Sequence, residues 1–223
     1  MSAAYDDVLK RLKEERNHLA WSQNEMSRYV RMSQSNYSKV ELGLRRLNYR
    51  ELEGLCESDV DIQYIYTAER SSAPYKNFFL KCDYSELRCY LGIIYSIAAF
   101  HYRSSFSEQW KQLYSRVKYV PLLEKNQGLG NIFLEVRRAE HCSQLQMAER
   151  LGVDVKKLRE LENGRCWPDS ELLCRIYEAF HIPPSVLLKN QKGMASEVAI
   201  LVELMEKENE KTVFDIIKLI HKN

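Results

Sequence analysis

An internal repeat constrains the fold of this chain more than any other feature of its sequence. Residues 16–46 align with residues 137–167 at a constant offset of 121 positions, and the alignment needs no gap. Identical or similar residues coincide at Arg16 and Arg137, Ser22 and Ser143, Gln23 and Gln144, Glu25 and Gln146, Met26 and Met147, Val30 and Leu151, Val40 and Leu161, Glu41 and Glu162, and Gly43 and Gly164. So many matches in register predict two copies of one structural unit.

Each copy carries the signals of a series of short helices. In the first copy, Ser22 and Glu25 form a capping-box pattern at the start of one helix. Ser33 is a candidate cap for the next helix, over 34–42, and Gly43 stands where a left-handed C-cap is favoured. A fourth helix is expected over 47–56. In the second copy the corresponding signals are Ser143, Asp154 and Gly164, and Pro168 is expected to open the next helix.

A pair of opposite charges recurs at one separation in both copies. Arg16 and Glu41 are 25 residues apart, and so are Arg137 and Glu162. We interpret both as structural salt bridges that tie the first helix of each copy to the end of its third, because a partly buried pair is costly to break on one side, by about 3–5 kcal/mol.

The pattern resembles the phage-repressor (Cro/C1, XRE-type) helix-turn-helix family. The residues that carry the resemblance are the leading Arg, the Ser-Gln that opens the second helix, and the Glu and the Gly, two positions apart, at the end of the third. The resemblance covers about 5–70 and 131–190. The resemblance implies an all-α chain with two lambda-repressor-like five-helix domains and sequence-specific binding of double-stranded DNA. The first copy departs from the pattern at Ser27 and Asn48, and the second places Val155 and Glu160 on the face expected to meet DNA.

A recognition helix enters the major groove with its N-terminal residues at the base edges. In the first copy the expected base contacts are Gln34, Ser35, Asn36, Ser38 and Lys39, since Gln suits adenine and Lys suits guanine. The expected phosphate contacts are Gln23, Arg45, Arg46 and Arg50.

Local charge favours the first copy as the stronger DNA reader. Residues 28–50 hold six bases against one acid, a net charge of +5, whereas residues 149–171 hold five bases against six acids, a net charge of −1. Phosphate neutralisation supplies most non-specific affinity for DNA. Weaker contacts from the second copy are expected at Gln144, Lys156, Lys157, Arg159 and Arg165.

The rest of the chain divides around the two copies. We expect domains at 1–70 and 129–190, a helical connector at 75–128 and a helical tail at 191–223, with linkers at 70–74 and 127–130. The aromatic residues of the connector pack between the two domains or line a pocket for an effector, which is a small molecule, a peptide or a protein. The apolar faces of the tail pack on the body or on a second chain, and the family resemblance favours a homodimer.

Other classes of protein find little support. The chain has no phosphate-binding glycine motif, no HExxH and no CxxC, so we expect no enzyme, no cofactor and no metal; Cys82 and Cys89 have no neighbouring His or Cys in the sequence to complete a zinc site. No apolar run reaches the roughly 18–20 residues of a membrane span. The first residues lack the apolar segment of a secretion signal, so a cytoplasmic protein with reduced thiols is expected.

The sequence therefore predicts a DNA-binding transcription regulator, a repressor or an activator. The alternative is a protein-interaction module, antitoxin-like or an adaptor, whose helix-turn-helix folds bind a protein partner. Salt-dependent binding to random duplex DNA discriminates the two, because only the regulator is expected to show it.

Overall fold

The computed structural model describes residues 3–104, 107–125, 129–205 and 207–221, and over these ranges the chain is helical without any β-strand. The helices are α1 Ala3–His18, α2 Gln23–Tyr29, α3 Gln34–Glu41, α4 Tyr49–Cys56, α5 Ile62–Thr67, α6 Ala73–Phe79, α7 Tyr84–Ser104, α8 Glu108–Val117, α9 Val120–Lys125, α10 Leu129–Ala139, α11 Gln144–Leu151, α12 Val155–Glu162, α13 Ser170–Phe180, α14 Pro184–Leu187, α15 Gln191–Glu203 and α16 Lys207–His221. The all-α class is confirmed. A helix able to span a membrane is not found in the described ranges.

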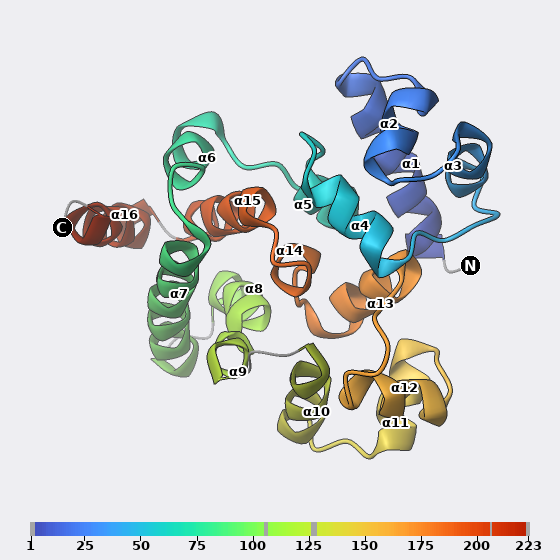
Figure 1. The fold of residues 1–223 in the computed structure, drawn as a ribbon. Helices are drawn as coiled ribbons and strands as arrows, with labels where there is room; N and C mark the ends of the chain where they lie inside the picture. The colour runs from blue at the N-terminus through green and yellow to red at the C-terminus, as the bar shows by residue number, and fades with distance from the viewer. Residues whose placement is uncertain (1–2, 105–106, 126–128, 206, 222–223) are drawn as a thin grey trace.

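Helices α1–α5 form a first bundle, which we call head 1 (Figure 1). The capping box of Ser22 with Glu25 starts α2, and the Ser33 side chain accepts a hydrogen bond from the Asn36 N–H at the start of α3. The fourth helix begins at Tyr49 rather than at 47, because Asn48 caps it in a second capping box. Buried side chains from all five helices meet in its core, among them Tyr5, Val8, Leu12, Met26, Tyr37, Val40, Leu52, Leu55 and Ile65.

Helices α10–α14 form head 2, and its helices follow head 1 at the offset of the sequence repeat. The third helices, over 34–41 and 155–162, differ by 121 positions at both ends. The starts of the second helices, 23 and 144, and of the fourth helices, 49 and 170, differ by the same number. Asp169 caps α13, so Pro168 lies before the cap and does not open the helix as expected. Gly43 and Gly164 both have positive φ, 73° and 65°, where a residue without a side chain avoids strain.

The predicted connector and tail are not separate units. Helices α6–α8 and the start of α9 share one apolar core with α15 and α16, and this core is distinct from that of the heads. The tail residues Val198, Leu201 and Met205 are buried in it, as are Val213 and Ile217. The tail thus packs on the body of its own chain, because the connector supplies the apolar surface that a short tail cannot supply itself. We call this body of α6–α9, α15 and α16 the support unit.

Both predicted linkers end earlier than expected where the structure describes them. Residues 70–72 join α5 to α6 outside any helix, as predicted, but α6 begins at Ala73; Arg70 pairs with Glu15 and Asp61. In the second linker, residues 127–128 lie outside the described residues, while Leu129 and Gly130 already belong to α10.

The two heads pack directly on each other, and their apolar residues form one continuous core. The backbone of Leu47 exchanges two hydrogen bonds with Ser170: Leu47 N–H donates to Ser170 Oγ at 3.1 Å, and Ser170 N–H donates to the Leu47 carbonyl at 2.9 Å. The Tyr49 hydroxyl donates to the Leu187 carbonyl, and the Tyr66 hydroxyl donates to the Ser170 carbonyl. The two bonds are reciprocal, because Tyr49 corresponds to Ser170 and Tyr66 to Leu187 in the repeat. Such reciprocity is typical of an interface with approximate two-fold symmetry.

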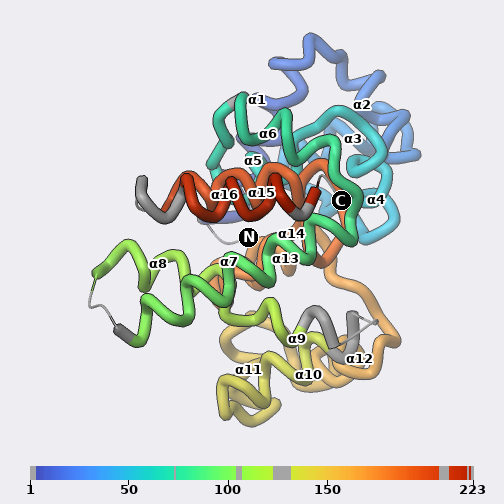
Figure 2. Tube along the Cα trace, turned by 90° about the vertical axis from the view of Figure 1, so that its left-hand side faces the viewer, coloured from blue at the N-terminus to red at the C-terminus, as the bar shows by residue number. Residues whose placement is uncertain are grey.

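This packing places α3 and α12 on one side of the molecule. Figure 1 shows both at the right, with the support-unit helices α6, α7 and α16 at the left. In Figure 2, viewed from that left side, α7, α15 and α16 lie in front and the two heads behind them. The support unit therefore leaves the side that carries α3 and α12 uncovered.

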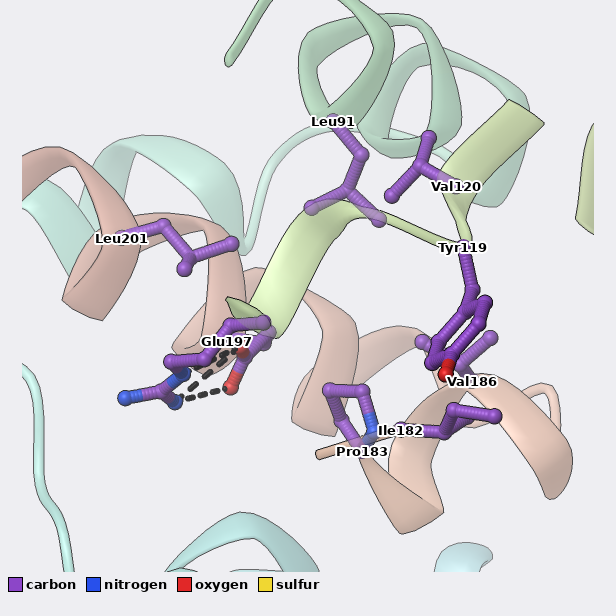
Figure 3. Close-up of a pocket in the computed structure, with 9 residues that line it drawn as sticks. Leu91, Tyr119, Val120, Ile182, Pro183, Val186, Glu197 and Leu201 are labelled. Carbon is purple, nitrogen blue, oxygen red and sulfur yellow. Dashed lines mark hydrogen bonds and ion pairs between the residues drawn. The ribbon is translucent and has the colours of Figure 1, made fainter. Parts of the chain in front are cut away.

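A buried ion pair joins the support unit to both heads (Figure 3). Arg116 of α8 binds Glu197 of α15 at 2.8 Å, and the two side chains are 8% and 1% exposed. Glu197 also accepts a hydrogen bond from Gln63 of head 1, whose amide oxygen accepts one from Ser185 of head 2. Burial raises the pKa of Glu197, and the charge of Arg116 opposes that shift. Every polar group in this network has a partner, as buried charges require.

Candidate nucleic-acid interface

Helix α3 of head 1 is amphipathic, and its polar side faces solvent. Tyr37 and Val40 are fully buried on one side, as the sequence predicts. With 3.6 residues per turn, Ser35, Ser38 and Lys39 fall on the opposite side. Gln34, Ser35 and Lys39 are exposed, and Asn36 and Ser38 are half-buried. All five predicted base-contacting residues are thus at least partly accessible to solvent, and three of them share the side opposite the core.

A buried clamp fixes α3 against α1 and α2. Arg16 Nε donates to Glu41 Oε1 at 2.6 Å, Arg16 Nη2 donates to Oε2 at 3.3 Å, and Arg16 Nη1 donates to the Trp21 carbonyl at 2.7 Å. Gln23 Nε2 donates to Glu41 Oε2 at 2.7 Å. Burial alone raises the pKa of Glu41, but the hydrogen bonds from Arg16 and Gln23 outweigh it and hold that pKa below its usual value. The carboxylate is therefore charged at neutral pH, and α3 is held rigidly.

The same clamp recurs in head 2 with matching atoms. Arg137 Nε lies 2.5 Å from Glu162 Oε1, Arg137 Nη1 donates to the Cys142 carbonyl, and Gln144 Nε2 donates to Glu162 Oε2 at 2.8 Å. Both salt bridges inferred from the sequence spacing are therefore present. They tie the third helix of each head to its first helix and to the start of its second.

The four predicted phosphate contacts differ in how free they are. Arg45 is 2.5 Å from Glu51, and Arg46 pairs with Glu171 and lies 3.8 Å from Asp169. The amide of Gln23 already serves Glu41. Arg50 is exposed and forms no ion pair with any described residue. A phosphate contact by Arg45 or Arg46 would thus require the arginine to exchange an internal partner for the phosphate.

In head 2, the predicted contact residues on and after α12 are open. Lys156, Arg159 and Arg165 are exposed, Lys157 is half-buried, and none forms an ion pair within the described part of the chain. Two of the six acids within residues 149–171 lie next to arginines of the same chain: Glu171 binds Arg46 and Arg175, and Asp169 lies near Arg46. The charge contrast predicted between the two copies is therefore smaller on the folded surface than in the sequence.

The contact between Arg46 and Glu171 could not be foreseen from the sequence, because the partners belong to different copies. Trp167 likewise stacks on Tyr49 across the heads, with ring centroids 5.0 Å apart. Arg28 is exposed on α2 and has no ion-pair partner among the described residues. In the sequence it was considered only as part of the net charge. The helical pattern of α2 could have predicted this exposure, because Met26 and Ser27 beside Arg28 are buried in the core.

Comparison with known proteins assigns the first head. A family model described as helix-turn-helix matches residues 12–58, from within α1 to the end of α4. The chain is also similar to the ImmF control region 10 kDa protein of Bacillus phage phi105, with 30% identity over 69 residues that cover 31% of this chain and 77% of that protein. The chain belongs to the helix-turn-helix family. No solved structure matches this helix-turn-helix protein significantly.

Proposed function

We propose that this helix-turn-helix protein is a DNA-binding transcription regulator that docks α3 in the major groove of a duplex. The observation that carries the proposal is the solvent-facing side of α3, where Gln34, Ser35 and Lys39 are exposed on a helix clamped from behind by Arg16 and Glu41. A groove-reading helix needs a fixed placement and exposed polar side chains, and α3 has both. Arg28, Lys39 and Arg50 are exposed cations that form no ion pair within the described residues.

We further propose that head 2 is a second copy of the same family unit. Its third helix, the N-caps of its second and third helices and its Arg137–Glu162 clamp repeat those of head 1. Because α3 and α12 lie on one uncovered side, a single chain has the arrangement that a dimer of one-headed proteins would need (Figure 1). The proposed target is therefore an operator with two half-sites that differ in sequence, since Gln34 and Lys39 correspond to Val155 and Glu160.

The proposal includes no catalytic step and no cofactor, and it assigns the protein to the cytoplasm, where its DNA target is found. A homodimer and an effector remain predictions. A homodimer would place four heads on DNA, and a size measurement by light scattering would test it.

The test is binding of the full chain to random duplex DNA over a range of salt concentrations. Affinity should fall steeply as salt rises, because cations on the heads displace counterions from phosphate. Lys39→Ala should weaken binding, whereas Lys218→Ala should not, because Lys218 lies on α16, on the other side of the molecule. Absence of salt-dependent binding, or equal losses in the two variants, would contradict the proposal.

One observation favours the alternative of a protein-binding module. Leu42 and Leu44, directly after α3, are 68% and 75% exposed, and Arg45 and Arg46 beside them are engaged by acids of the same chain. Exposed leucines side by side are typical of a surface that contacts protein. If random DNA is not bound, Leu42→Ser with Leu44→Ser becomes the variant that tests this second function, by loss of a captured protein partner.

A further inference from the structure

Three side chains capable of binding a metal meet on the support unit, away from α3 and α12. Cys82 lies in the turn between α6 and α7, Glu86 in the first turn of α7, and His221 in the last turn of α16. Each residue offers one ligand atom, and these three atoms all lie within 4.8 Å of one another. His221 is 139 residues from Cys82 in the chain, so no local spacing in the sequence indicates this group.

The distances suit a small tetrahedral cation. Cys82 Sγ is 3.9 Å from His221 Nδ1, and His221 Nδ1 is 3.0 Å from Glu86 Oε1. Zinc binds sulfur at about 2.3 Å and nitrogen or oxygen at about 2.0–2.2 Å, which places two ligands of a tetrahedral site roughly 3.5 Å apart. The distance from Sγ to Nδ1 is somewhat longer than this value, and the distance from Nδ1 to Oε1 is somewhat shorter.

The hydrogen bonding of His221 points to a ligand that the three side chains share. Cys82, Glu86 and the Tyr90 hydroxyl, 3.4 Å away, all approach the same ring nitrogen Nδ1. A single imidazole nitrogen serves as one donor or one acceptor, so it cannot satisfy three groups at once. A cation placed between the thiol, the carboxylate and the imidazole would satisfy them together.

The surroundings hold the ligands in place. The second oxygen of Glu86 accepts a hydrogen bond from the Asp83 N–H at 2.6 Å, which fixes the carboxylate at the start of α7. Cys82 is fully buried, and the Phe78 ring lies edge-on to His221 at 5.3 Å between centroids. Glu86 and His221 are 36% and 30% exposed, so an ion can reach the group from solvent. Outer contacts of this kind orient metal ligands.

We propose that Cys82, Glu86 and His221 form a zinc-binding site that fastens α16 to the turn between α6 and α7. A thiol and an imidazole favour Zn²⁺ over Mg²⁺ or Ca²⁺, which prefer oxygen ligands. Binding breaks the S–H bond of Cys82, forms a bond between sulfur and zinc, and releases the proton to solvent. Without the ion, α16 is held mainly by Val213, Phe214 and Ile217 on the support-unit core.

The experiment uses the full chain, freed of metal with a chelator and titrated with Co²⁺ as a spectroscopic substitute for Zn²⁺. The wild-type protein should bind one equivalent, with a sulfur-to-cobalt charge-transfer band that Zn²⁺ abolishes. Cys82→Ser should lose the band, and His221→Ala should weaken binding by more than roughly ten-fold, since loss of an outer partner alone costs 10- to 100-fold. Cys89→Ser should keep the band, because Cys89 is exposed on α7 outside the group.

A second measurement keeps the test independent of folding defects. Zn²⁺ should slow amide hydrogen exchange in α16 of the wild-type protein but not of His221→Ala, whose substitution is at a partly exposed position. A band that survives in Cys82→Ser, an absence of binding at one equivalent, or equal exchange with and without Zn²⁺ would each overturn the proposal.

Discussion

Replacing Glu41 with Ala tests whether the clamp behind α3 holds head 1 together. The Glu41 side chain is 4% exposed and accepts two hydrogen bonds from Arg16 and one from Gln23. Its removal leaves the Arg16 guanidinium, 10% exposed, without its carboxylate partner, although it still donates to the Trp21 carbonyl. Breaking one side of a buried pair costs about 3–5 kcal/mol, a large share of the roughly 5–15 kcal/mol that stabilises a folded protein.

The assay is equilibrium unfolding in urea, followed by circular dichroism. With a slope of about 1–3 kcal/mol per molar urea, a loss of about 3 kcal/mol lowers the midpoint by about 1 M or more.

The repeat offers a matched variant for this measurement. Glu162→Ala removes the same three bonds in head 2, where Arg137 is 17% exposed. Its cost should equal that of Glu41→Ala or fall slightly below it, because water reaches Arg137 more easily. Glu53→Ala, at an exposed position on α4, is the control and should change stability by less than about 0.5 kcal/mol. A loss below about 1 kcal/mol in both clamp variants would refute the reasoning.

Three further predictions concern the interface and the junction between head 2 and the support unit. Gln34→Ala should cost about 1–3 kcal/mol at one base position of the operator and little elsewhere, which a base-by-base binding titration checks; an unchanged base preference would contradict the assignment. Arg50→Ala should lower the salt slope of DNA binding by about one, and Arg45→Ala should lower it less, because Arg45 is engaged by Glu51; equal slopes would contradict this difference. Burial raises the pKa of Glu140, but hydrogen bonds from Tyr119, Arg150 and Lys118 outweigh it and lower the pKa from 4.5 to about 2. A carboxylate with a lowered pKa stabilises the fold above about pH 4.5, and this stability is lost as the pH falls toward 2. Glu140→Gln should therefore be less stable at neutral pH, and its stability should change less with pH in acid unfolding. If the variant unfolds in acid as the wild type does, the prediction is wrong.

Local signals carried the prediction of the heads. A Ser cap, a Glu three residues later and a Gly at the end of a helix act within a few residues, so their effect is visible in the sequence itself. The equal spacing of Arg16–Glu41 and Arg137–Glu162 added one tertiary contact, because two copies of the same spacing are improbable unless the partners meet. The start of the fourth helix was predicted less well. It was expected at residue 47, but Asn48 takes the cap position and the helix begins at Tyr49.

Long-range pairing accounts for what the sequence did not reveal. Val198 and Ile217 show only that the tail has apolar faces, and the surface that covers them comes from α6–α8, far earlier in the chain. The same applies to Arg46, whose acid partner Glu171 lies in the other head, and to His221, which meets Cys82 through the packing of α16 on the support unit. Such contacts follow from topology, which no local pattern encodes.

The central claim is that one chain presents α3 and α12 to a single DNA duplex as a fixed pair. The most direct test selects bound sequences from a random duplex library with the full chain and then inserts five base pairs between the two halves of the selected operator. The insertion turns one half-site to the opposite side of the helix, since a turn takes about 10–10.5 base pairs. Affinity should fall to the level of a single half-site. Unchanged affinity, or a selected sequence with only one conserved half, would contradict it.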